Sequence, residues 1–261
     1  MNTNHQGSGQ RQLAAVIMAA GKGTRMKDPS RAKVMYEVDG RPMIHSVVDL
    51  AYELDAQRVI VVVGHQAQAV ETYLRKSHSD IECVLQAQQL GTGHAVLQAK
   101  DRLNGFAGSV VVLSGDVPLL RRSTMESLLH HHEETGATAT ILTAALADAT
   151  GYGRIIRNVH ASVERIVEHR DANEQEKAIN EVNSGIYVFN AARLFDALTH
   201  ISAHNAQNEY YLTDVFAYFW KNHWKVAALI AKDAMEIRGV NTPAQLEEAR
   251  EVARALKKVG A

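Results

Sequence analysis

The chain has 261 residues, a formal net charge of −1 and a single cysteine, Cys83. A chain of this length can bury the core of one large α/β domain or of a domain with an appendage. The near-neutral charge creates no overall electrostatic attraction for nucleic acid or an anionic membrane, so we expect neither as a partner. A single cysteine cannot form an internal disulfide, which fits a protein of the reducing cytoplasm. Because its neighbours are largely apolar, we expect Cys83 to be a core residue rather than a nucleophile.

Residues 1–12 are polar and contain no apolar signal-peptide core, so we expect a disordered leader. Runs rich in valine and isoleucine then alternate with helical patterns through the first half of the chain. Strands are predicted at 13–19, 58–63, 81–86 and 109–114, and helices at 42–55, 66–76, 92–103 and 123–135. Near-continuous apolar strands separated by helices predict a Rossmann-like, mostly parallel α/β sheet with helices on both faces. Such sheets bind ligands at the carboxyl ends of their strands.

The second half of the chain is predicted to be richer in strands. Strands are expected at 138–146, 152–157, 162–168, 182–190 and 225–231, and helices at 191–198 and 211–221. Little helix separates the first four strands, which predicts a smaller, mixed or antiparallel β-rich extension. The last helix, within 243–261, begins with Thr242 as N-cap and Pro243 as first residue. His130-His131-His132 are consecutive, so they fan out on a helix and cannot share a metal; we expect a solvated face.

A glycine-rich turn at residues 18–26 follows the first predicted strand. Glycine tolerates positive φ and lets backbone amides curl around an anion. Three cations lie within reach of this turn: Lys22, Arg25 and Lys33. The glycine spacing fails the P-loop pattern, and Met26 stands where a dinucleotide fingerprint needs a small residue, which argues against an oxidoreductase. The turn is therefore either a polyphosphate cradle or an ordinary connection between a strand and a helix.

Two further polar segments follow predicted strands. Asp116 is either a turn residue that bonds nearby amides or a Mg²⁺ ligand, since a hard cation prefers carboxylate oxygen. Gln86 offers both an acceptor and a donor to the edge of a base. The amides of residues 91–93 can contact a base or phosphate at a helix N-terminus, although Thr92 can equally act only as a cap. Polar residues further along are singly more typical of turns or bulges, yet suit sugar hydroxyls: Gly153, Glu168 and Asn183.

These segments occur in an order that resembles a known family. Residues 18–26 with Lys33 resemble the signature loop of the sugar-nucleotide pyrophosphorylases. The chain from about 13 to about 241 is most similar to the uridylyltransferase half of the bacterial N-acetylglucosamine-1-phosphate uridylyltransferases. The other matching segments are 84–95, 115–119, 150–155, 166–169, 181–185, 208–214 and 239–241.

The resemblance implies a Mg²⁺-dependent enzyme that converts UTP and N-acetylglucosamine 1-phosphate to UDP-N-acetylglucosamine and pyrophosphate by in-line attack. It implies a nucleotide-diphospho-sugar transferase fold over residues 13–242, with a nucleotide-binding half at about 13–120 and a sugar-binding half, the β-rich extension, at about 121–242. A C-terminal helix would occupy 243–261.

Each functional residue of the family has a counterpart in this chain. Arg25 and Lys33 would be catalytic, and Asp116 and Asn241 would hold Mg²⁺. UTP would contact Met18, Ala19, Ala20, Gly21, Gly23, Gln86, Gly91, Thr92, Ser114 and Gly115, and the sugar would contact Gly153, Glu168 and Asn183.

Two departures from the family pattern carry expectations of their own. Ala32 stands where the family has a proline before the lysine, which predicts a looser backbone ahead of Lys33. No hexapeptide repeats of a β-helix follow, so acetyltransferase activity is not expected and the oligomeric state is open. The alternatives are a nucleotidyltransferase for another nucleotide or another sugar, such as glucose 1-phosphate, and a non-catalytic nucleotide-sugar sensor.

Overall fold

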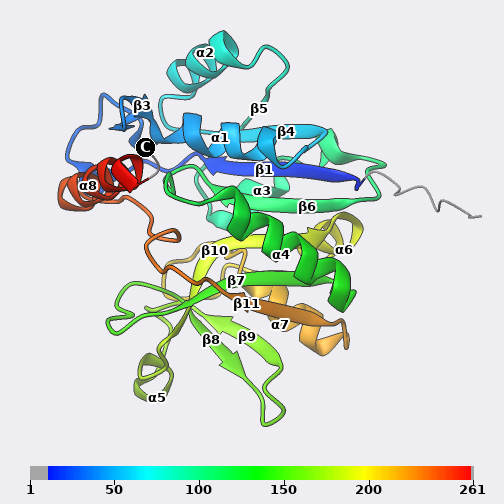
Figure 1. Ribbon diagram of the computed structural model, residues 1–261. Coiled ribbons are helices and arrows are strands. Elements are labelled where there is room, and N and C mark those ends of the chain that lie inside the picture. Colours follow the sequence, from blue (N-terminus) through cyan, green and yellow to red (C-terminus); the bar gives the residue numbers. More distant parts are fainter. Residues whose placement is uncertain (1–10, 260–261) are drawn as a thin grey trace, which may run out of the picture.

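The fold is known from a computed structural model that describes residues 11–259. Over these residues a nine-stranded sheet forms the centre, and seven of its strands follow the order β11-β7-β10-β6-β1-β4-β5 (Figure 1). Their bounds are β1 Leu13–Ala19, β4 Arg58–Val63, β5 Glu82–Leu85, β6 Ser109–Ser114, β7 Ala139–Ala145, β10 Glu181–Asn190 and β11 Val226–Ile230. β10 pairs antiparallel with β6 and with β7, whereas the other pairs along this order are parallel. The predicted Rossmann-like, mostly parallel sheet is confirmed.

Helices cover both faces of the sheet. Residues of β1 alternate between the two faces: Leu13, Ala15 and Ile17 pack on one side, and Ala14 and Val16 on the other. On the first side lie α1 (Met43–Glu53), α2 (Ala67–Ser77) and α4 (Arg122–Thr135); on the second lie α3 (Thr92–Leu97), α6 (Ala191–Ala197) and α7 (Asp214–Lys221). The apolar strands are therefore buried on both faces, as the continuous valine runs predict.

The β-rich extension is narrower than the strand pattern predicts, because β7, β10 and β11 join the main sheet. The part that projects from it is the hairpin of β8 (Arg154–Arg157) and β9 (Val163–Val167), followed by the short helix α5 (Glu174–Lys177) (Figure 1). The hairpin is attached to β10 through the pair Val182 and Arg154. One continuous sheet thus carries both halves of the chain.

The C-terminal helix α8 (Pro243–Val259) lies beside a small hairpin of β2 (Glu37–Val38) and β3 (Arg41–Pro42) (Figure 1). The Thr242 hydroxyl accepts a hydrogen bond of 3.2 Å from the Gln245 amide, which confirms the predicted N-cap. The Arg250 guanidinium donates to the Glu37 carbonyl at 2.9 Å. A small apolar cluster joins this helix to the glycine-rich loop, with Met26, Val38, Met43, Val240 and Leu246 as members.

The histidine run on α4 is only partly on a solvated face. His130 is exposed and pairs with Glu134, but His132 is 6% exposed and its Nδ1 lies 2.9 Å from the Thr140 hydroxyl. Burial lowers the pKa of the His132 imidazole. The prediction was wrong for His132, because the third residue of the run points inward between α4 and β7.

Three other predictions meet the structure here. Residues 1–10 of the expected leader lie outside the described residues; of the other two, Arg11 pairs with Glu133, and the Gln12 carbonyl accepts a hydrogen bond of 2.9 Å from Ser109. Cys83 is half-buried, and burial raises the pKa of its thiol to about 11, which fits a packing residue rather than a nucleophile. Among the described helices, none has the length and apolar character needed to span a bilayer.

Candidate functional site

Two cavities meet at the carboxyl ends of β1 and β6. The larger has a volume of about 520 Å³ and is lined by Met18, Ala19, Ala20, Gly21, Lys22, Lys33, Gln86, Gly91 and Thr92, among others. The smaller, of about 240 Å³, is lined by residues that include Arg25, Ser184 and Asn241. Ser114 and Asp116 line both. The two cavities therefore adjoin at these two residues.

Glycines allow the backbone to close tightly around this junction. Gly23 has φ +61°, and a Cβ at this position would lie 2.6 Å from the Cβ of Lys33. A Cβ at Gly115 would lie 2.8 Å from Ile44, and the Gly115 amide donates to the Met18 carbonyl at 3.0 Å. The turn at 18–26 is thus packed directly against the segment that carries Lys33.

A charged network occupies the junction. The Lys33 ammonium pairs with the Asp116 carboxylate and donates to the Asn241 side-chain oxygen at 2.9 Å. The Arg25 guanidinium donates to the same Asn241 oxygen at 2.9 Å. The Lys33 and Asp116 side chains are each 15% exposed, so water screens their attraction less than at the open surface. The four residues that the sequence assigns to catalysis and metal binding therefore form one cluster.

This cluster has the donor set that a hard divalent cation requires. One carboxylate oxygen of Asp116 and the amide oxygen of Asn241 both accept from the Lys33 ammonium, so the two oxygens face a common point that already holds a positive charge. Carboxylate and amide oxygens are ligands that Mg²⁺ accepts. The residues present fit such an ion.

Ala32 takes the backbone conformation of the proline that it replaces. Its φ of −61° and ψ of 135° lie in the range that a proline ring fixes, and the 3₁₀ turn Lys33–Met35 follows directly. The Ala32 side chain is 3% exposed. Packing of Ala32 in the core is compatible with this conformation without the ring, and the looser backbone expected ahead of Lys33 stays a prediction.

The segment around Gln86 is built from side-chain bonds to the backbone. Gln86 is 3% exposed, and its Nε2 donates to the Gly91 carbonyl at 3.1 Å. The Thr92 hydroxyl accepts a 2.9 Å hydrogen bond from the Leu212 amide and makes no cap of α3, so the capping interpretation of Thr92 is wrong. Gly91 has φ +113°, and a Cβ there would lie 2.5 Å from the Tyr210 carbonyl. The loop is fixed by a glycine that nothing larger can replace without displacement.

Gly153, Glu168 and Asn183 lie on the projecting side of the sheet and, over the described residues, are not part of the lining of either cavity. The Asn183 amide donates to the Gly153 carbonyl at 2.9 Å, and the Asn183 side chain donates to the Tyr187 hydroxyl at 2.7 Å. Ser184, the next residue, lines the smaller cavity and so connects this group with the junction.

Burial sets the protonation of the acidic groups here. The Glu168 carboxyl accepts from the Thr213 hydroxyl at 3.0 Å, and burial raises its pKa. Burial, with the nearby Glu168 and Asp171, also raises the pKa of Asp214 to about 6. Thr213 and Tyr187 were not singled out from the sequence, although both lie in or next to the segments that carry the resemblance.

Comparisons with known proteins show the family of the chain. The family described as nucleotidyl transferase matches residues 14–238. The protein is 47% identical over 240 residues to the "Bifunctional protein GlmU" of Geobacillus sp. (strain WCH70), and 48% identical over 238 residues to the protein of that name from Halalkalibacterium halodurans. These alignments cover 92% and 91% of this chain but 51% of each relative, so the chain spans about half the length of the curated relatives it matches.

Solved structures share the fold. A UDP-glucose pyrophosphorylase complexed with UDP-glucose superposes with a TM-score of 0.74 at 18% identity, covering 95% of this chain and 99% of the other. An apo UDP-glucose pyrophosphorylase gives a TM-score of 0.76, also at 18% identity, with 96% and 100% covered. At this identity the likeness concerns the fold.

Proposed function

Because the chain belongs to the nucleotidyl transferase family, we propose that it transfers the uridylyl group of UTP to N-acetylglucosamine 1-phosphate, releasing pyrophosphate. The observation that carries this proposal is the junction of the two cavities, where Arg25, Lys33, Asp116 and Asn241 converge. Two substrates that must react with each other have adjoining spaces there, and the charged groups lie where the spaces meet. A cytoplasmic location suits a protein whose lone cysteine is unpaired.

In this proposal UTP occupies the larger cavity. The backbone from Met18 to Gly21 and the segment at Gln86, Gly91 and Thr92 form its walls. The Gln86 Nε2 is engaged by the Gly91 carbonyl, which leaves the Gln86 carbonyl oxygen as the group that can accept a hydrogen bond from a base. Glycine at 91 lets this wall approach the backbone of Tyr210 closely.

The reaction is an in-line displacement at the α-phosphorus of UTP. A phosphate oxygen of the sugar phosphate forms the new P–O bond, the bond to the β-phosphate oxygen breaks, and pyrophosphate leaves. No protein nucleophile is required. Arg25 and Lys33 stabilise the negative charge that accumulates on the phosphate oxygens, and the cavity walls hold the reactants in line.

Asp116 and Asn241 would hold the Mg²⁺ ion, which when bound supplies Lewis-acid stabilisation of phosphate oxygens. The Lys33 ammonium pairs with the Asp116 carboxylate. If the Asp116 carboxylate holds Mg²⁺, the Lys33 ammonium is free to contact phosphate oxygens instead.

The sugar would bind on the side of the smaller cavity. Asn183 and Gly153 are held together by a backbone hydrogen bond, and the adjacent Ser184 lines that cavity. Glu168 supplies a carboxyl whose oxygens suit a sugar hydroxyl or an amide N–H, both of which are donors.

A substrate panel tests the proposal. Purified protein is incubated with Mg²⁺, with UTP, CTP or dTTP, and with the 1-phosphates of N-acetylglucosamine, glucose or galactose, and pyrophosphate release is measured. We expect the highest kcat/KM for UTP with N-acetylglucosamine 1-phosphate. No pyrophosphate from that pair would refute the proposal, and a preference for glucose 1-phosphate would reassign the sugar.

The same assay separates an enzyme from a nucleotide-sugar sensor. Asp116→Asn keeps the size of the side chain but removes its charge, and we expect it to reduce turnover by about a hundredfold or more. Lys27→Asn is the matched control, because Lys27 is an exposed cation of the same loop with φ +62°, a conformation that asparagine tolerates. We expect this control to retain activity.

A further inference from the structure

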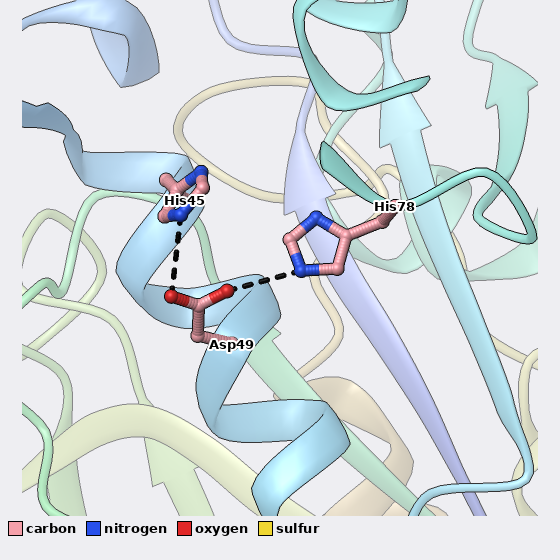
Figure 2. A group of neighbouring side chains, drawn as sticks. All are labelled: His45, Asp49 and His78. Carbon is pink, nitrogen blue, oxygen red and sulfur yellow. Dashed lines mark hydrogen bonds and ion pairs between the residues drawn. The ribbon is translucent and has the colours of Figure 1, made fainter. Parts of the chain in front are cut away.

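A second cluster of potential ligands lies between α1 and the end of α2. His45 and Asp49 are one helical turn apart on α1, and His78 is the residue that follows the last turn of α2 (Figure 2). Both imidazole rings point toward the Asp49 carboxylate. Over the described residues, the lining of the two cavities of the candidate site does not include any of the three.

The distances within this cluster are close to those of a metal site. The His45 Nε2 lies 3.3 Å from one Asp49 oxygen, and the His78 Nε2 lies 3.0 Å from the other. One ligand atom from each residue can be chosen so that all lie within 4.8 Å of one another. Bonds of about 2.0–2.2 Å to a tetrahedral zinc ion place ligand atoms about 3.4 Å apart. Small side-chain rotations are enough to reach that spacing.

The outer nitrogens of both rings have partners of their own. The His45 Nδ1 lies 3.1 Å from the Tyr73 hydroxyl, and the His78 Nδ1 lies 3.0 Å from the Ser77 hydroxyl. Metal-bound histidines usually donate the hydrogen of the second nitrogen in this way, which fixes the ring and leaves the other nitrogen for the metal. Tyr52 further restrains His78, because the two rings stack at 5.0 Å with an angle of 5° between their planes.

Ser77 is itself held in place by the backbone. Its hydroxyl donates to the Leu74 carbonyl at 3.2 Å, so the oxygen that faces the His78 Nδ1 is fixed. On the other side of the ring, the His78 Nε2 lies 3.0 Å from an Asp49 oxygen.

We propose that His45, Asp49 and His78 bind a divalent transition-metal ion of the zinc class, which links α1 to the end of α2. Two imidazoles and one carboxylate favour Zn²⁺ or Co²⁺ over Mg²⁺ and Ca²⁺, which prefer all-oxygen sites. The side chains of His45 and His78 are 14% and 15% exposed and that of Asp49 is 32% exposed, so the fourth ligand is water.

Arg41 opposes this binding and provides a test of it. One of its guanidinium nitrogens lies 3.5 Å from the His45 Nε2 and 3.5 Å from an Asp49 oxygen, so its positive charge is close to the position proposed for the metal ion. The Arg41 side chain is 65% exposed and can turn into solvent. We expect Arg41→Ala to tighten metal binding several-fold, because it removes a like charge.

The full chain is titrated with Zn²⁺ in the presence of excess Mg²⁺, and binding is measured by calorimetry. A parallel titration with Co²⁺ is monitored by visible absorption. Excess Mg²⁺ occupies the oxygen ligands of the candidate active site. We expect one equivalent of Zn²⁺, a tetrahedral Co²⁺ spectrum, and a higher melting temperature with Zn²⁺. His45→Gln and His78→Gln should each weaken binding by at least about tenfold, and Tyr73→Phe by roughly tenfold.

Controls separate this site from other histidines and from the active site. His130→Gln alters an exposed histidine that faces a single carboxylate, Glu134, and should bind Zn²⁺ as the unmodified protein does. Asp116→Asn should also retain the site, so the outcome does not depend on the proposed function. Unfolding in EDTA verifies that each variant is folded. Failure of the unmodified protein to bind Zn²⁺ or Co²⁺, or unchanged binding by folded His78→Gln, would overturn the proposal.

Discussion

The Arg25 guanidinium and the Asn241 side-chain oxygen lie 2.9 Å apart, although 216 positions separate the two residues in the chain. Asn241 directly precedes Thr242, the cap of α8, and that helix packs on the apolar cluster that contains Met26 of the glycine-rich loop. The last helix thereby fixes both Asn241, a proposed metal ligand, and the loop that carries Arg25.

Arg25→Ala tests this contact. Removal of one charge-stabilising group from the transition state typically lowers turnover about a hundredfold or more. We expect that loss in kcat for pyrophosphate release, with a smaller change in KM, and little change in melting temperature because Arg25 is exposed. An equal loss with Lys27→Asn would show that net charge near the loop, rather than Arg25 itself, is responsible.

Gly91→Ala tests the wall of the larger cavity. The new Cβ would meet the Tyr210 carbonyl at 2.5 Å, so the loop must move away from the segment at Glu209 and Tyr210. We expect kcat/KM for UTP to fall roughly tenfold or more, because small displacements of binding groups have large effects on rate. Gly105→Ala is the control, since Gly105 also has positive φ, at +76°, but open space around it. If both variants lose activity equally, the clash is not the cause.

Asp214→Asn tests the buried acidic group next to the proposed sugar site. The pKa of Asp214 rises from an ordinary value of 3.8 to about 6 in the folded protein, so its contribution to stability is complete below about pH 4 and is lost as the pH rises through 6. Asparagine carries no proton to lose. The unfolding free energy of the variant minus that of the wild type should therefore be about 1 kcal/mol larger at pH 8 than at pH 4. This is less than the full pKa shift implies, because the group is partly solvated.

Urea unfolding at the two pH values measures this difference. Asp148 provides a control of opposite sign, because hydrogen bonds from Thr150 lower the pKa of its carboxylate. Asp148→Asn should therefore lose stability at pH 8 relative to its wild type. A pH-independent effect of Asp214→Asn would contradict the assigned ionisation.

Ala32→Pro tests the backbone ahead of Lys33. Because Ala32 already has φ −61°, the ring restricts mainly the unfolded chain, and we expect a gain of about 0.4–1 kcal/mol in unfolding free energy with pyrophosphate release retained. Ala32→Gly should change stability in the opposite direction. Both are measured by urea denaturation, and a destabilised proline variant would show that the ring does not fit the core.

The strands of the sheet were the most predictable part of the fold. Bounds of β1, β4 and β6 coincide with the predicted ranges, because each is a short, continuous apolar run with a polar residue or turn at its end. Helices were less exact at their ends. α7 begins at Asp214 rather than 211, since the Leu212 amide donates to the Thr92 hydroxyl instead of to a helix, and α3 ends at Leu97 before a separate 3₁₀ turn.

The candidate site was predictable where its residues follow strands. The sequence places Asp116 at a strand end, and the structure brings it to Lys33 and Asn241. Local patterns could not reveal that Lys33 pairs with Asp116, because that contact spans 83 positions along the chain. For the same reason local patterns did not point to the pair His45 and His78; the local signal at this cluster is the one-turn spacing of His45 and Asp49.

The reversed direction of β10 has a consequence for synthesis and for any attempt to divide the protein. β10 covers the edge of β6, and β6 is made well before it. Until β10 emerges, a nascent chain presents the unpaired backbone of β6, the kind of edge that recruits strands from other molecules. A fragment ending near residue 120 keeps that edge permanently, so the two halves are interlocked parts of one folding unit rather than exchangeable modules.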